Sequence, residues 1–286
     1  MTRRQAIKTA GLAAAAATLA PRRAAAAADA APLAGRIRHS VCRWCYKDIS
    51  LDNLCAAARR IGLPAVDLVT LDDLPVLKKY GLICALLTGV PGDIARGLNR
   101  VENHAQIAAF FEKTIPLAAE AGCPNIICFS GNRQGMSEAQ GLENCAAGLK
   151  SFIALAEKSN VTVCMELLNS KVNHKDYMCD HTAWGVELCR RVGSDRFKLL
   201  YDIYHMQIME GDVIHTIRDN HQFIAHYHTG GVPGRHEIDE TQELYYPAIM
   251  KAILATAFKG FVAQEFLPLG SDPLASLEKC VRICDV

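Results

Sequence analysis

The sequence lacks a strong excess of charge of either sign. It has 31 Lys and Arg residues against 30 Asp and Glu residues, a formal net charge of +1. Five of the basic residues lie within the first 23 positions, so without that segment the net charge is −4, or −3 if Asp29 is removed with it. A mildly acidic protein is a poor ligand for a polyanion, so we expect no nucleic-acid partner.

Long apolar runs are also missing after the N-terminal 31 residues, where none reaches the roughly 18 residues that a membrane-spanning helix needs. At the N-terminus, Arg3 and Arg4 precede an uncharged, Ala-rich run and small-residue cleavage sites up to about Ala31. This order is typical of a twin-arginine export signal. We expect residues 1–35 to be that signal and a short disordered segment, and the mature protein to be soluble, periplasmic or otherwise exported, without a membrane partner. The alternative is a cytosolic Ala-rich helix or arm.

The twelve cysteines show no second ligand pair to complete a zinc site with the CxxC of Cys42 and Cys45. Most of the others lie in apolar runs, where Cys acts as a small hydrophobic residue. Because twin-arginine export passes folded proteins, we expect buried and reduced thiols despite the oxidising destination.

A glycine-rich turn is absent after the first predicted strand, in SVCRWCYKD (residues 40–48), which argues against a doubly wound nucleotide-binding sheet. Short apolar runs instead alternate with stretches of helical periodicity. The predicted strands are Ile37–Cys42, Ala65–Thr70, Leu82–Leu87, Asn125–Ser130, Val161–Leu167, Phe197–Asp202, Ile224–Thr229 and Phe261–Phe266. The predicted helices include Leu51–Ile61, Val101–Ala121, Glu138–Ser159, Thr182–Val192, Val213–Asn220, Tyr246–Ala257 and Asp272–Cys284. Eight strand–helix units in about 250 residues predict an α/β fold, a single-domain (β/α)8 TIM barrel over residues 36–286 with a short second helix.

Ionisable residues stand at the ends of the last four predicted strands, where barrels of this kind carry their chemistry. They are Glu166, Asp202, the pair His226 and His228, and Glu265. Singly, each is as well explained by a helix cap, an ion pair or a hydrogen-bonded core histidine. Together, three carboxylates at one barrel mouth would repel one another unless a cation neutralises them.

A divalent metal held by Glu166, Asp202, His228 and Glu265 is the simplest such cation. Oxygen-rich ligation with one imidazole and no thiolate favours Mn²⁺ or Mg²⁺, and Co²⁺ also fits. His226 lies one layer deeper, so we expect it in the barrel lumen or behind the ligands.

Four segments in this order resemble the hydroxypyruvate isomerase branch of the xylose isomerase-like TIM-barrel family, which also contains ketose 3-epimerases. They are MELLN (165–169), YDIYHMQIMEGD (201–212), PGRHEIDETQELYYPAI (233–249) and QEF (264–266). The resemblance covers essentially the whole chain after the signal, and it implies the same four metal ligands. It further implies that Glu166 and Glu265 are the catalytic pair that exchanges protons with substrate, and that His205 and Arg235 contact substrate oxygens.

This chemistry predicts an isomerase of a small α-hydroxycarbonyl compound or sugar. The metal stabilises an enediolate, one carboxylate removes a C–H proton and the other returns one. We expect hydroxypyruvate to be converted to tartronate semialdehyde. Relatives of the hydroxypyruvate type often have Gln at the position of His228, whereas the epimerases have His, so a 3-epimerase of the tagatose or psicose type is an alternative.

Two alternatives come from other functional classes. An endonuclease IV-like nuclease needs extra histidines on strands two to four, and these contain none. A non-catalytic sugar-binding barrel would not need the two glutamates as proton-transfer groups. The sequence leaves the oligomeric state open, a homo-oligomer included.

Each loop residue near the predicted metal site has two possible roles. Asn169 orients a ligand or makes an Asx turn, and we favour the former and count it among the substrate contacts. Arg133 is a second cation for a substrate carboxylate or a solvated loop charge. The insertion Ser170–Trp184 is a candidate lid, in which His174 and His181 are lid contacts or plain surface residues.

Overall fold

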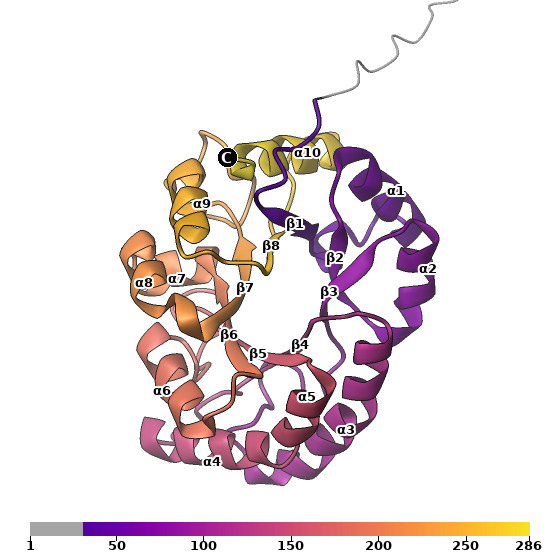
Figure 1. Cartoon of the computed structure of the whole chain (residues 1–286). Helices are drawn as coiled ribbons and strands as arrows, with labels where there is room; N and C mark the ends of the chain where they lie inside the picture. The colour runs from indigo at the N-terminus through magenta and orange to yellow at the C-terminus, as the bar shows by residue number, and fades with distance from the viewer. Residues whose placement is uncertain (1–30) are drawn as a thin grey trace, which may run out of the picture. The chain divides into compact units, whose positions relative to one another are not determined.

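Alternating strands and helices form a ring in the computed structural model of the chain, which describes residues 31–286 (Figure 1). The eight strands are β1 (Arg38–Val41), β2 (Ala65–Val69), β3 (Ile83–Leu87), β4 (Asn125–Cys128), β5 (Thr162–Glu166), β6 (Phe197–Asp202), β7 (Ile224–Thr229) and β8 (Phe261–Gln264). Consecutive strands from β2 to β8 pair in parallel, and β8 pairs with β1. This confirms the expected (β/α)8 barrel. The first 30 residues, which include most of the predicted export signal, lie outside the described residues.

The ring closes between β1 and β2, the two strands at the ends of the sheet order. The residue after β1, Cys42, forms an isolated parallel bridge with Asp67 in the middle of β2. On its other side, β2 slips in register against β3 on both sides of Asp67. Leu68 adopts a left-handed backbone with φ of 57°, which costs a non-glycine residue about 1–2 kcal/mol. We call this junction the seam of the barrel.

Helices surround the strands on the outside of the ring (Figure 1). They are α1 (Leu51–Ile61), α2 (Leu74–Lys79), α3 (His104–Glu120), α4 (Glu138–Lys150), α5 (Ile153–Ser159), α6 (Thr182–Val192), α7 (Ile203–Met209), α8 (Val213–Asn220), α9 (Tyr246–Ala255) and α10 (Pro273–Cys284). Short 3-10 helices are η1 (Arg43–Tyr46), η2 (Leu71–Asp73), η3 (Val101–Asn103) and η4 (His221–Phe223). The second helix is short, as expected, and α1, α6 and α8 have the predicted bounds.

Two helical segments differ from the prediction. The expected helix Glu138–Ser159 is interrupted between α4 and α5, where the Ser151 hydroxyl donates to the Gly148 carbonyl oxygen at 2.6 Å. Phe152 then leaves helical geometry and stacks on Phe111 with ring centroids 4.3 Å apart. The second difference is α7, which replaces the expected loop after β6 and is short, apolar and mostly buried.

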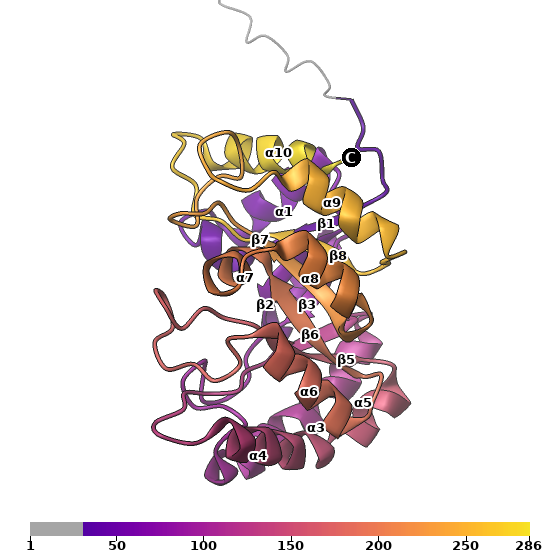
Figure 2. The ribbon, with the colours of Figure 1, turned by 90° about the vertical axis from the view of Figure 1, so that its left-hand side faces the viewer.

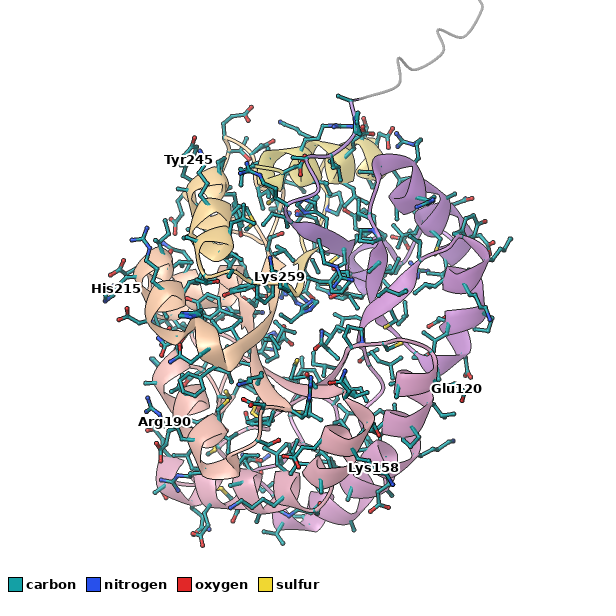
Figure 3. The ribbon with its side chains drawn as sticks, in the orientation of Figure 1. Glu120, Lys158, Arg190, His215, Tyr245 and Lys259 are labelled. Atoms are coloured by element: carbon teal, nitrogen blue, oxygen red, sulfur yellow. The ribbon has the colours of Figure 1, made fainter. Side chains whose placement is uncertain are left out.

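The described chain separates apolar and charged side chains across the helix ring. Fully buried residues such as Phe197, Leu199 and Tyr227 come from the strands, whereas Glu120, Lys158 and Arg190 lie on the outer rim (Figure 3). The loop between β5 and α6 projects beyond the strand ends (Figure 2). No helix within residues 31–286 is both long and apolar enough to cross a bilayer.

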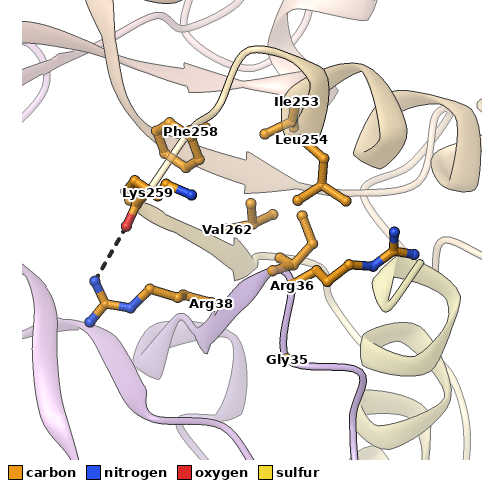
Figure 4. Close-up of a pocket in the computed structure, with 10 residues that line it drawn as sticks. Gly35, Arg36, Arg38, Ile253, Leu254, Phe258, Lys259 and Val262 are labelled. Carbon is orange, nitrogen blue, oxygen red and sulfur yellow. Dashed lines mark hydrogen bonds between the residues drawn. The ribbon is translucent and has the colours of Figure 1, made fainter.

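A pocket lies at the opposite end of the barrel, where β1 and β8 begin (Figure 4). Arg36, Phe258 and Val262 line it, and Nη1 of Arg38 donates to the carbonyl oxygen of Lys259 at 3.3 Å. Its lining contains no carboxylate and no histidine. The predicted metal ligands lie instead where the strands end.

Candidate metal centre

The four predicted metal ligands meet at one end of the barrel. Glu166 and Asp202 are the last residues of β5 and β6, His228 lies near the end of β7, and Glu265 directly follows β8. One ligand atom from each lies within 4.8 Å of the corresponding atoms of the others. The side chains are buried, the most exposed being Glu166 at 5%. The strand register aligns two of them directly, because Asp202 pairs with His228.

The donor set suits a divalent ion. Nδ1 of His228 lies 2.6 Å from Oε2 of Glu265 and 3.7 Å from Oε1 of Glu166. Within the described chain this nitrogen is buried and lacks the geometry of a hydrogen bond to any partner. An imidazole nitrogen without a hydrogen bond, surrounded by carboxylate oxygens, offers the N and O ligands that Mn²⁺ accepts. The residues therefore fit the metal that the sequence predicts.

Arg235 already supplies positive charge to this cluster. Its Nη2 lies 2.9 Å from Oδ2 of Asp202 and 2.6 Å from Oε2 of Glu265. The rings of Trp44 and Tyr204 lie 5.2 and 5.1 Å from the guanidinium carbon. The protein itself thus places one cation beside these carboxylates. The argument from sequence, in which a metal ion neutralised them, did not anticipate this.

One guanidinium does not balance three carboxylates. Burial raises the pKa of the Asp202 carboxyl to about 8, with Arg235 opposing that rise. Burial also raises the pKa of Glu166, with His228 opposing. For Glu265 the effect of burial is outweighed by Arg235 and His228, which hold its pKa well below the usual range. Two of the three carboxyl groups therefore bind protons more readily than in water, chiefly because they are buried.

His205 is positioned to donate a proton into the site. Burial and the neighbouring Arg235 charge lower its pKa, so the ring is neutral near pH 7. The backbone N–H of Asn169 donates to Nδ1 at 3.1 Å, which leaves the ring proton on Nε2. Nε2 lies 3.0 Å from Nη1 of Arg235. The two side chains are therefore neighbours in the site, as the predicted substrate contacts of His205 and Arg235 require.

Asn169 holds the loop after β5 in place. Its Oδ1 accepts from the backbone N–H groups of Val172 and Asn173 at 3.0 and 2.9 Å, so the side chain caps the turn that follows it. Its side-chain nitrogen lies 2.6 Å from Nδ1 of His205. Asn169 therefore stabilises a local turn, one of the two roles predicted for it, and its side chain also contacts His205. Direct contact between Asn169 and a substrate stays a prediction.

Trp44 joins the centre without having been predicted. The 3-10 helix η1 follows β1 directly, and from it Nε1 of Trp44 donates to Oε1 of Glu265 at 2.5 Å. The side chain is 40% exposed, so it lies at the boundary between the buried carboxylates and solvent. The sequence signal was an aromatic residue just after a strand end, within the CxxC segment.

Asp67 is the second residue that the sequence reasoning missed. His226 does lie one layer below His228 on β7, as expected. Its Nε2 lies 2.5 Å from Oδ2 of Asp67, and the same oxygen lies 3.5 Å from Nε2 of His228. The available signal was a carboxylate in the middle of the apolar strand AVDLV.

Arg133 and the insertion after β5 form one structural unit. The Arg133 guanidinium donates to the carbonyl oxygens of Tyr177 and Met178 and to Oδ1 of Asp180, the last at 2.7 Å. It therefore anchors this loop and is neither a solvated charge nor aimed at the four ligands. His174 packs against His205 with ring centroids 5.2 Å apart, whereas His181 is half exposed and pairs with Asp180.

Comparisons with known proteins agree with the barrel fold. Residues 55–278 match the sequence profile of the xylose isomerase-like TIM barrel family. A 2-oxo-tetronate isomerase of Cupriavidus necator is 30% identical over 201 residues, 67% of this chain and 75% of that protein. A human hydroxypyruvate isomerase candidate is 28% identical over 208 residues, 68% of this chain and 73% of that protein. The crystal structure of a family 2 AP endonuclease from Brucella melitensis has a TM-score of 0.77 at 23% identity, with 84% of this chain and 96% of the other covered.

Proposed function

This chain belongs to the xylose isomerase-like TIM barrel family, and we propose that it is a divalent-metal-dependent isomerase of small α-hydroxycarbonyl compounds. Relatives at about 30% identity are named as isomerases of hydroxypyruvate and 2-oxo-tetronate. Both names describe a compound with a carbonyl group beside a hydroxylated carbon. Isomerisation between adjacent carbons is therefore the class of reaction, and hydroxypyruvate is the substrate that we propose.

The convergence of Glu166, Asp202, His228 and Glu265 supports this proposal most strongly. A divalent ion bound there supplies a Lewis acid that stabilises the negative charge of an enediolate. A structural ion would need no proton-transfer groups and no second set of donors. Here two glutamates approach the same Nδ1 atom of His228, and the side chains of His205 and Arg235 lie within 3.0 Å of each other beside them.

The chain's own residues account for the proton movements. One glutamate carboxylate takes the proton from the hydroxyl-bearing carbon, and the electron pair of that C–H bond moves into the C–C bond of the enediolate. His205 and Arg235 donate hydrogen bonds to the substrate oxygens. The other glutamate, which holds a proton beforehand, returns it to the neighbouring carbon. The proton of the substrate hydroxyl passes to the former carbonyl oxygen, so the carbonyl and hydroxyl groups exchange places. Return of the proton to the first carbon, from the opposite face, would give an epimer.

The epimerase outcome is the alternative, and His228 favours it. Epimerases of the family have His at this position, whereas the hydroxypyruvate enzymes often have Gln. Neither outcome changes the role proposed for the glutamates. The two differ only in the carbon that receives the proton, which a labelling experiment identifies.

Proton NMR in deuterated water tests the proposal directly. Protein loaded with Mn²⁺ would be incubated with hydroxypyruvate, with a four-carbon 2-oxo sugar acid, and with a panel of ketohexoses. Spectra of the products would be recorded after removal of the metal. We expect tartronate semialdehyde from hydroxypyruvate, with deuterium on the newly protonated carbon. Conversion of a ketohexose to its C3 epimer alone would favour the epimerase.

Absence of both turnover and deuterium exchange on every compound would contradict an enzymatic role and favour a sugar-binding barrel. The nuclease alternative is tested separately by measuring affinity for abasic DNA at moderate salt. The protein without its N-terminal segment has a negative net charge, so we expect it to bind weakly.

A further inference from the structure

We propose that Asp67, acting with His226, is a positioning residue that fixes the ring of His228 with Nδ1 toward the metal and the proton on Nε2. This inference rests on the proposed metal centre. Asp67 lies on the opposite side of His228 from Glu166 and Glu265, because it faces Nε2 while they face Nδ1.

The buried position of Asp67 is energetically unfavourable in itself. Its side chain is completely buried although it is a carboxylate, and burial of an unpaired charge is strongly unfavourable. The left-handed backbone of Leu68 and the two register slips beside Asp67 interrupt an otherwise regular strand. Irregularities of this kind re-aim side chains and are common beside active sites. Here the irregularity accompanies a carboxylate that touches the rings of two histidines.

The ring chemistry of His228 shows why an acceptor is needed at this point. A neutral imidazole carries one N–H group and one lone pair. Nδ1 can ligate an ion only through its lone pair, so the proton must lie on Nε2, and that N–H group needs an acceptor in the core. Oδ2 of Asp67 is the nearest carboxylate oxygen to Nε2, at 3.5 Å. Metal-ligating histidines commonly donate their second N–H to such a carboxylate.

His226 explains how the carboxylate stays in place. Its Nε2 lies 2.5 Å from Oδ2 of Asp67, the closest contact of that carboxylate among the described residues. The two imidazole rings stand almost perpendicular, at 84°, with centroids 5.2 Å apart. His226 therefore holds the Asp67 oxygen in place. A short movement of the His228 ring would shorten the 3.5 Å distance between its Nε2 and that oxygen to a hydrogen bond.

Cys42 offers a competing explanation and a matched control. Its Sγ lies 3.7 Å from Nε2 of His228, and Cys42 bridges to Asp67 across the seam. A thiol sulfur is a much weaker acceptor than a carboxylate oxygen. If the proposal is correct, losing the carboxylate weakens ion binding and losing the thiol does not.

Calorimetric titration with Mn²⁺ would compare the wild-type protein with Asp67→Asn and with Cys42→Ala. Asparagine keeps the shape and one acceptor oxygen, so the variant is expected to fold, which circular dichroism checks. We expect Asp67→Asn to bind Mn²⁺ about 10- to 100-fold more weakly, the range for loss of such an outer partner. Cys42→Ala should stay within about threefold of wild type. Equal affinity of Asp67→Asn and wild type would overturn the inference and leave the metal proposal intact.

A spectroscopic measurement on wild-type protein keeps the inference testable if Asp67→Asn does not fold. Proton NMR of the Co²⁺-loaded protein should show one paramagnetically shifted, exchangeable resonance from the Nε2–H of His228, present in H₂O and lost in D₂O. Its absence would overturn the positioning role. Binding of two ions with one lost in Asp67→Asn would also overturn it, because Asp67 would then be a ligand. Failure of wild-type protein to bind any ion would overturn both proposals.

Discussion

Nη2 of Arg235 lies 2.6 Å from Oε2 of Glu265, the same oxygen that lies 2.6 Å from Nδ1 of His228. The guanidinium therefore occupies an oxygen that the proposed ion needs. Protein and ion supply positive charge to the same carboxylates, so the two cations compete. The arginine must therefore shift or share this oxygen when the ion binds.

We expect Arg235→Gln to bind Mn²⁺ more tightly than wild type and to turn over more slowly. Removing the competing charge should raise the affinity about tenfold, which corresponds to ~1.4 kcal/mol. Loss of a donor to the substrate oxygens should lower kcat about 100-fold. Calorimetry and steady-state kinetics measure the two effects. Weaker ion binding by this variant would show that Arg235 supports the ion instead of competing with it.

Asp202→Asn should lose metal and activity but keep the fold. The loss of Mn²⁺ affinity should exceed the ~10- to 100-fold typical of outer partners, because a ligand oxygen is replaced. Folding should persist, because Asp202 caps α7 through an oxygen that asparagine retains. The control is Asp195→Asn just before the same strand, where the carboxylate meets Lys198 at the surface. Retention of wild-type ion binding by Asp202→Asn would contradict the site.

Stability should fall with acid because of His39, a buried residue of β1 that faces Asp285. Burial lowers the pKa of this histidine to about 4, although Asp285 opposes the shift. The folded protein thus binds this proton less readily than the unfolded chain, whose histidine has a pKa of about 6.5. The contribution to stability is full above pH 6.5 and is lost as the pH falls toward 4, by about 3 kcal/mol in total. Unfolding by urea at several pH values measures it.

His39→Gln removes the group that titrates, and the variant should show a shallower decline of stability between pH 6.5 and 4 than wild type. Parallel declines in the two proteins would assign the acid sensitivity to other residues.

A thiol reagent should react slowly with the native protein, and first at Cys123. All twelve cysteines are free and buried, and burial raises the pKa of Cys55 to about 11 and that of Cys280 to about 12. A hydrogen bond with Cys84 lowers the pKa of Cys123. Since the thiolate is the reactive form, native labelling should be slow. After denaturation without reductant, twelve thiols should react. A smaller count would reveal disulfides formed after the protein folds.

The barrel and the four predicted ligands follow from local sequence patterns. Strand ends such as Glu166 and Asp202 stand out because an apolar run stops at an ionisable residue, and parallel strands bring such ends to one edge. These features repeat at regular intervals, so no long-range information is needed to find them.

The remaining parts of the site depend on contacts between distant segments. Asp67 meets His226 and His228 only because β2 and β7 face one another across the barrel. Arg235 reaches Asp202 and Glu265 from a left-handed backbone position that the residue type does not signal. Asn169 illustrates a third difficulty, since the same side chain suits a turn and a ligand equally well until the loop is seen.

The bridge between Cys42 and Asp67 joins the first strand of the barrel to the second, and Asp67 also faces the back of His228. An ion bound by His228 would thus be coupled, through Asp67, to the contact between β1 and β2 that closes the barrel. Separation of β1 from β2 would displace the imidazole ring of His228 that binds the ion. Ion binding would therefore oppose that separation. The backbone amides along these two edges are therefore the ones whose exchange with solvent should slow most when the ion arrives.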